Sequence, residues 1–131
     1  MIFVDTSAWY AFFASGDANH AAANRLLVSI KEPLVTSDYV VDESLTLFRS
    51  RSEDRRAFTF GTKVIDDGFA KIIQISDADF AQAWQIFQHF ADKKWSFTDC
   101  TSRVVMQRLG IGRAFAFDEH FRQFGTVTVV P

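Results

Sequence analysis

The sequence predicts an α/β fold, a three-layer α/β/α sandwich around a central, mainly parallel sheet of four or five strands. Short apolar runs alternate with longer segments of helical periodicity along all 131 residues. Strands separated by helices imply parallel pairing through right-handed crossovers. The hydrophobic fraction of 48% is enough for a buried core. Since no linker, low-complexity stretch or internal repeat interrupts the pattern, we expect a single domain over residues 1–131.

The first half of the chain begins with a strand. Ile2–Val4 is an apolar run that ends at Asp5, typical of a buried strand. A helix through Ala14 should follow, capped by Thr6 or Ser7. The next expected elements are a helix over 19–31, a strand over 34–36, a helix from Ser37 or Asp38 to about Arg51, and a helix over 54–66.

The second half continues the alternation to the C-terminus. We expect a strand over 71–75, a helix from Ser76 or Asp77 to about 91, a helix over 97–109 that stops at Gly110, a strand over 114–117, a helical turn over 119–124 and a strand over 127–130. Ligands bind outside the carboxyl ends of the strands in such sheets. Asp5 and Asp118 each follow a strand, so topology should place both at one rim.

Composition limits the function classes. The net charge of −2 argues against binding nucleic acid through overall positive charge, although a metal in an acidic pocket can supply a local positive potential. No window is long and apolar enough for a membrane span, and we expect no membrane partner. The lone Cys100 cannot form an internal disulfide and should be buried, which favours the reducing cytoplasm. Most of the fifteen Phe residues should be core, with some at an interface.

Two acids in the first half are candidate ligands, and each has a structural alternative. Asp5 could cap the helix that follows it, although Thr6 and Ser7 could cap equally well. Glu43 lies at the rim of the apolar face of its helix, while Asp42 points further toward solvent. The alternative for Glu43 is an ordinary solvated acid.

Two further acids lie near the C-terminus. Asp99 fits a capping box with Ser96 and an ion pair with Arg103 one turn later, and both are structural roles. Asp118 could cap the turn after its strand. The combination of all four acids is the stronger signal, because neighbouring carboxylates repel by roughly 4 kcal/mol per pair and need a cation. Oxygen ligands favour Mg²⁺ or Mn²⁺, and such sites activate water for phosphodiester hydrolysis.

Four motifs carry a family resemblance. They are Phe3–Ser7, the helix with Glu43, Ser96–Cys100 and Phe117–Phe121. In order and spacing they resemble the PIN-domain ribonucleases, and the short chain is similar to the VapC-type toxins of prokaryotic toxin–antitoxin pairs. The resemblance implies a PIN-like fold and a Mg²⁺- or Mn²⁺-dependent endoribonuclease. It makes Asp5, Glu43, Asp99 and Asp118 catalytic, with Asp5, Asp99 and Asp118 as metal ligands and Thr6 as a supporting hydroxyl.

The resemblance also implies partners and products. The substrate would be RNA, cut to leave a 3′-hydroxyl and a 5′-phosphate. A small antitoxin would fill the acidic cleft, often with a basic side chain, and a homodimer would be common. One departure is Ala116, which stands where many members have Thr or Ser two residues before the fourth acid.

Alternatives remain at this stage. The chain could be an RNA-processing nuclease that is not a toxin, or a non-catalytic PIN module that binds RNA or protein; the presence of all four acids favours an enzyme. His20, His89 and His120 lack metal-ligand spacing and are predicted to be surface or rim residues. The basic side chains of Arg49, Arg51, Arg55, Arg56, Lys93 and Lys94 could guide RNA or form a solvated face.

Overall fold

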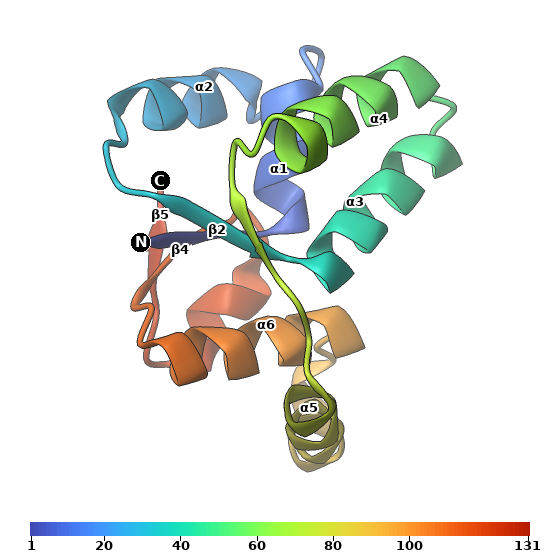
Figure 1. Cartoon of the computed structure of the whole chain (residues 1–131). Coiled ribbons are helices and arrows are strands. Elements are labelled where there is room, and N and C mark those ends of the chain that lie inside the picture. Colours follow the sequence, from blue (N-terminus) through green and yellow to red (C-terminus); the bar gives the residue numbers. More distant parts are fainter.

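A five-stranded, all-parallel sheet forms the centre of the computed structural model, which describes residues 1–131 (Figure 1). The strands are β1 (Ile2–Val4), β2 (Leu34–Ser37), β3 (Lys71–Ile73), β4 (Arg113–Phe115) and β5 (Thr128–Val130), in the order β3-β2-β1-β4-β5. In the central strand β1, Phe3 pairs with Val35 of β2 and Ala114 of β4. The predicted α/β class with a parallel sheet of four or five strands is confirmed.

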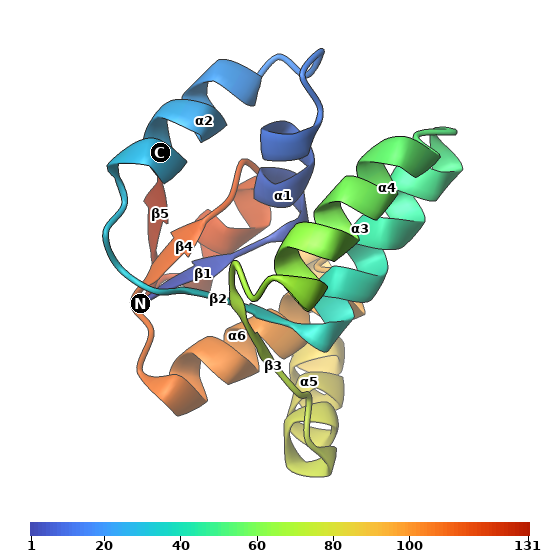
Figure 2. The same cartoon turned by 45° about the horizontal axis from the view of Figure 1, so that its top comes forward.

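Helices cover both faces of the sheet. They are α1 (Thr6–Phe13), α2 (His20–Ser29), α3 (Asp38–Ser50), α4 (Asp54–Gly61), α5 (Asp77–His89) and α6 (Phe97–Leu109), with a π-helical turn η1 (Thr62–Asp66) and 3₁₀ turns η2 (Ala91–Lys93) and η3 (Glu119–Phe124). Helices α1 and α2 lie on one side of the sheet and α6 on the other, with α5 packed against α6 (Figure 2). None of the helices has the length and apolar character needed to cross a membrane.

Two expected boundaries differ for identifiable reasons. The helix predicted over 54–66 is α-helical only to Gly61 and then widens into η1. The strand predicted over 114–117 ends at Phe115. Beyond it, the Phe117 amide donates to the Ser7 hydroxyl at 2.9 Å instead of to a neighbouring strand. The chain is thereby turned toward the carboxyl edge of the sheet just before Asp118.

The core joins the sheet to both helical layers. Its largest fully buried side chains include Trp9, Phe3, Phe48 and Phe115. The Trp9 indole donates to the Thr36 hydroxyl at 3.2 Å, and that hydroxyl donates to the Val4 carbonyl at 3.0 Å. This buried chain of hydrogen bonds satisfies the polar atoms at the end of β1 and fixes where the strand stops.

Candidate active site

All four predicted acids line one depression of about 310 Å³ at the carboxyl edge of the sheet. Asp5 follows β1, Glu43 lies on α3, Asp99 lies in the first turn of α6, and Asp118 precedes η3. The remaining lining includes Thr6, Ser7, Leu47, Lys94, Ser96 and His120. Parallel strands end at the same edge, so four segments spread over the whole chain contribute carboxylates to one place.

Asp5 is both the helix cap and a member of the cluster. Its side chain is 3% exposed, and its Oδ2 accepts from the Ser7 amide at 3.2 Å and the Ser7 hydroxyl at 2.8 Å. The expectation that Thr6 or Ser7 would cap α1 is therefore wrong, because Asp5 itself is the N-cap. The second oxygen, Oδ1, is buried and has no hydrogen-bond partner.

Ser7 was not among the predicted site residues, yet it links two of the acids. Its hydroxyl donates to Asp5 and accepts from the amides of Phe117 at 2.9 Å and Asp118 at 3.3 Å. This hydroxyl therefore joins the end of β1 to the segment after β4. No local pattern reveals the contact, because Ser7 and Phe117 are 110 positions apart.

We predict that Ser7→Ala lowers RNA cleavage by about 10- to 100-fold, the range found when groups that orient metal ligands are removed. The substitution leaves the Phe117 and Asp118 amides without this acceptor, and Asp5 keeps the bond from the backbone amide of position 7 but loses the shorter one from the hydroxyl. Steady-state cleavage kinetics measure the effect, with Ser29→Ala as control, since Ser29 bonds only a carbonyl of its own helix on α2. An unchanged rate in Ser7→Ala would contradict the linking role.

Glu43 is half-buried on α3 and faces the other acids, as its position on the helix predicted. Burial raises the pKa of the Glu43 carboxyl, the hydroxyls of Thr6 and Thr98 partly offset that rise, and the nearby Asp99 and Asp118 carboxylates add to it. Thr6 is buried beside Glu43, and its hydroxyl accepts from Ser44 at 3.4 Å. Thr6 thus lines the same depression as the acids, and the supporting role of its hydroxyl stays a prediction.

Asp99 has the capping role that its sequence allowed and still faces the site. It forms the capping box with Ser96, accepting from the Ser96 amide at 3.0 Å. The predicted ion pair with Arg103 is not formed; instead, Asp99 Oδ2 lies 2.8 Å from His120 Nδ1. The capping box and the histidine together hold this carboxylate toward the depression.

His120 is a member of the cluster, so its description as a surface or rim histidine was incomplete. Its Nδ1 also lies 3.4 Å from Asp118 Oδ1, and its backbone amide donates to the same oxygen at 2.9 Å. Burial lowers the pKa of His120, but the bond to Asp99 and the charges of Asp118 and Asp99 outweigh burial, so the pKa is raised. A protonated His120 partly neutralises the acids.

The cluster retains an excess of negative charge. Burial, together with repulsion from Asp99 and Glu43, raises the pKa of Asp5 to about 7, although its bonds to Ser7 oppose the shift. As placed, no three acidic or histidine side chains converge on one ion position. The donor set nevertheless fits a hard divalent cation, since the acids offer only oxygen ligands and Asp5 Oδ1 lacks a partner.

Most predicted guiding arginines are engaged elsewhere. Arg49 pairs with Asp54 at 3.0 Å, and Arg56 pairs with Glu53 at 2.7 Å. The Arg51 guanidinium lies over the Tyr10 ring, 4.6 Å from its centre. Lys94, by contrast, lines the acidic depression and is the basic side chain best placed to meet a phosphate there.

Comparison with known proteins agrees with this geometry. Residues 2–127 match the model of the PIN domain. The chain belongs to the PIN-domain family. Over 131 residues it is 36% identical to the 23S rRNA-specific endonuclease VapC20 of Mycobacterium tuberculosis, covering 100% of this chain and 99% of the relative. It is also 27% identical to ribonuclease VapC26 of the same species, with 98% of each chain covered.

A solved structure shares the whole PIN fold. The crystal structure of Mycobacterium tuberculosis VapC20, described as a sarcin-ricin loop cleaving toxin, superposes with a TM-score of 0.93 at 35% identity, and each chain is covered completely. In the present PIN domain, Ala116 is buried and its amide donates to the Val130 carbonyl at 3.1 Å. The segment from Ala116 to Asp118 is therefore fixed by β5 and by Ser7, without a hydroxyl at position 116.

Proposed function

We propose that this PIN domain is a metal-dependent endoribonuclease and the toxin of a toxin–antitoxin pair. One observation carries the proposal: Asp5, Glu43, Asp99 and Asp118 gather in one depression of a chain that resembles a 23S rRNA-specific endonuclease along its full length. By analogy with that relative, the substrate is a structured loop of ribosomal RNA, and the nuclease domain extends over residues 1–131. RNA as substrate and a single buried cysteine both favour a cytoplasmic location.

The acids divide the chemistry. Asp5, Asp99 and Asp118 would hold Mg²⁺ or Mn²⁺, directly or through waters. When bound, the ion would polarise the scissile phosphate and lower the pKa of the attacking water. Glu43, on α3 beside Thr6, orients that water and accepts its proton. Ser7 keeps Asp5 and the Asp118 segment in register, and the products carry a 3′-hydroxyl and a 5′-phosphate.

The reaction can be tested directly. A hairpin with the sarcin–ricin sequence and a fully paired duplex of equal length are incubated with the protein and Mg²⁺, Mn²⁺ or excess EDTA. We expect one cut in the loop, dependent on the added ion, and a 5′-phosphate on the downstream fragment. A protein that cuts neither RNA, or that cuts equally well in EDTA, would overturn the proposal.

An antitoxin is the protein partner we propose. The acidic depression carries a net negative charge and would accept a basic side chain of a short inhibitory peptide, as Lys94 already approaches it from this chain. Such a peptide would compete with both the metal and the RNA. Inhibition that weakens as Mg²⁺ is raised would support this competition, and inhibition independent of the ion would oppose it.

A homodimer is the second proposed assembly. Helix α5 exposes Phe80, Trp84 and Phe87, which are 50%, 50% and 41% exposed, and large apolar patches usually mark contacts between proteins. We predict that Trp84→Glu converts a dimer to a monomer in sedimentation velocity experiments. Val28→Glu is the matched control, because Val28 is 80% exposed on α2 and stands apart from this patch. A sedimentation coefficient unchanged by Trp84→Glu would remove α5 from the interface.

A further inference from the structure

Arg103 on α6 is a charged side chain without a counter-ion. Its Nε and Nη1 are buried and have no hydrogen-bond partner. The acid one turn earlier, Asp99, is held by Ser96 and His120 instead. Arginine stays charged at all physiological pH values, and buried donors that lack acceptors destabilise a fold. No acid of the chain neutralises Arg103, and the part of its guanidinium that lines two surface depressions remains open to an anion from outside the chain.

Three aromatic rings hold this guanidinium in place. Its central carbon lies 4.9 Å from the Phe90 ring centre, 5.5 Å from that of Trp95 and 6.0 Å from that of Phe124. Cation–π contacts stabilise the charge and position it, but they accept none of its N–H groups in a full hydrogen bond. Four other arginines form ion pairs with acids. Arg108, for example, bonds Asp79 through two contacts of 2.9 and 2.8 Å.

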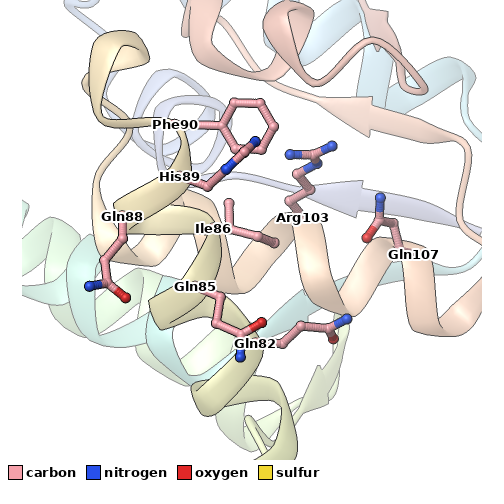
Figure 3. Close-up of a pocket in the computed structure, with 8 residues that line it drawn as sticks. All are labelled: Gln82, Gln85, Ile86, Gln88, His89, Phe90, Arg103 and Gln107. Carbon is pink, nitrogen blue, oxygen red and sulfur yellow. The ribbon is translucent and has the colours of Figure 1, made fainter.

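Arg103 lies where two depressions meet. The larger, about 650 Å³, is lined by side chains of α5 and α6, including Gln82, Gln85 and His89 (Figure 3). The smaller, about 320 Å³, runs toward the loop after α6, and both are lined by Arg103 and Gln107. We call the two together the Arg103 furrow. No carboxylate lines either part, although the whole chain is acidic.

This lining suits a phosphodiester backbone. Arginine and glutamine side chains are among the groups that commonly contact phosphate oxygens, and glutamine also bonds base edges. The furrow has these groups and no acid that would repel a polyanion. An acidic peptide could bond Arg103 too, but the proposed substrate already brings a polyanionic RNA to this domain, and glutamine amides can bond base edges as well as phosphates.

Two of the aromatic rings around Arg103, Trp95 and Phe124, belong to segments that also carry residues of the acid cluster. Trp95 directly precedes Ser96, which caps the helix of Asp99, and Phe124 ends the 3₁₀ turn that begins after Asp118. The Trp95 indole also donates to Gln123 at 2.8 Å. We propose that the Arg103 furrow binds a phosphate of the RNA substrate outside the cleaved bond, an inference that rests on the proposed function.

Charge changes at the exposed Gln107 test the furrow without altering the three aromatic rings around Arg103. The Kd for a labelled sarcin–ricin hairpin is measured by fluorescence anisotropy over a range of salt, in an Asp5→Asn background whose cleavage should be too slow to disturb the measurement. Gln107→Glu should weaken binding about fivefold and Gln107→Lys should strengthen it. Asn24→Asp, an exposed amide-to-acid change on α2, should leave the Kd unchanged.

Arg103→Gln should lower the slope of log Kd against log salt by about one, as expected for one lost phosphate contact. In the active protein, Gln107→Glu should raise KM while kcat stays within about twofold of the wild type. If all furrow variants bind and cut the RNA normally, the furrow does not bind its phosphate, and the proposed function is unaffected. A polyglutamate peptide that binds there in place of RNA would equally overturn the role of the furrow in binding RNA.

Discussion

The Asp5→Asn variant should cleave RNA about a thousandfold more slowly than the wild type, or not at all. Asp5 is the most buried of the four acids and lies at the end of the central strand. Asparagine keeps the size of the side chain and an oxygen that can still cap α1. It loses the negative charge that would hold the ion, and several kcal/mol of transition-state stabilisation correspond to this loss of rate.

The same substitution should make the metal-free protein more stable at neutral and alkaline pH. The pKa of the Asp5 carboxyl is 3.8 in its ordinary state and about 7 in the fold, chiefly because it is buried. Ionising it in the folded state therefore costs free energy. The penalty is absent below pH 4, grows between pH 4 and 7, and is complete above pH 7, where it is on the order of 4 kcal/mol. Asparagine removes it.

Two measurements check this pair of expectations. Cleavage rates are compared with excess Mg²⁺, and urea unfolding is followed in EDTA at pH 4.5 and pH 8. Asp42→Asn is the matched control, because Asp42 is exposed on α3 beside Glu43 and should change neither quantity. Wild-type cleavage by Asp5→Asn would remove Asp5 from the machinery. A variant less stable than the wild type at pH 8 would show that the ionised, buried Asp5 does not destabilise the metal-free fold.

Local patterns predicted the elements that carry the acids. The apolar run Ile2–Val4 and the capping residues before α3 and α6 are signals that depend only on neighbouring residues, and these elements appear close to their expected bounds. The parallel topology then follows from the alternation of strands and helices. Because strand ends meet at one edge, the approach of Asp5 and Asp118 could also be predicted.

Contacts between distant segments were beyond the reach of these patterns. The bonds from Ser7 to the segment after β4 depend on how two loops meet in space, and so does the contact between His120 and Asp99. A single sequence offered Arg103 as the nearest cation to Asp99, because helical spacing favours that pair. In the structure, Asp99 contacts His120 instead, and Arg103 therefore has no acid as a partner.

An ion pair between the buried Asp79 of α5 and the exposed Arg108 of α6 could not be predicted from local patterns either. Asp79 is 2% exposed; it forms a capping box with Ser76 and accepts two hydrogen bonds from Arg108. Burial alone would raise the pKa of Asp79, but the bonds from Arg108 and Ser76 outweigh burial and lower it. The carboxylate thus closes the helix start and joins α5 to α6 at once.

We expect Asp79→Ala to lower the free energy of unfolding by about 1–3 kcal/mol, since it removes half of the capping box and the two bonds to Arg108, whose exposed guanidinium water can then solvate. A lowered folded pKa means that this stabilisation is present above about pH 4 and is lost as pH falls through the folded value. Urea titrations at pH 7 and at pH 3 should therefore show a large difference between wild type and variant only at pH 7.

An exposed pair provides the control for this second prediction. Glu32 pairs with Arg113 at the surface, and Glu32→Ala should change the unfolding free energy by less than about 1 kcal/mol. Equal losses of unfolding free energy in Asp79→Ala and Glu32→Ala would contradict the larger contribution expected of the buried Asp79 carboxylate. Because Asp79 does not line the acidic depression, Asp79→Ala should still cut RNA near the wild-type rate at temperatures where it remains folded. The two predictions together separate the roles: Asp79→Ala should lose stability while it keeps cleavage, and Asp5→Asn should lose cleavage without losing stability.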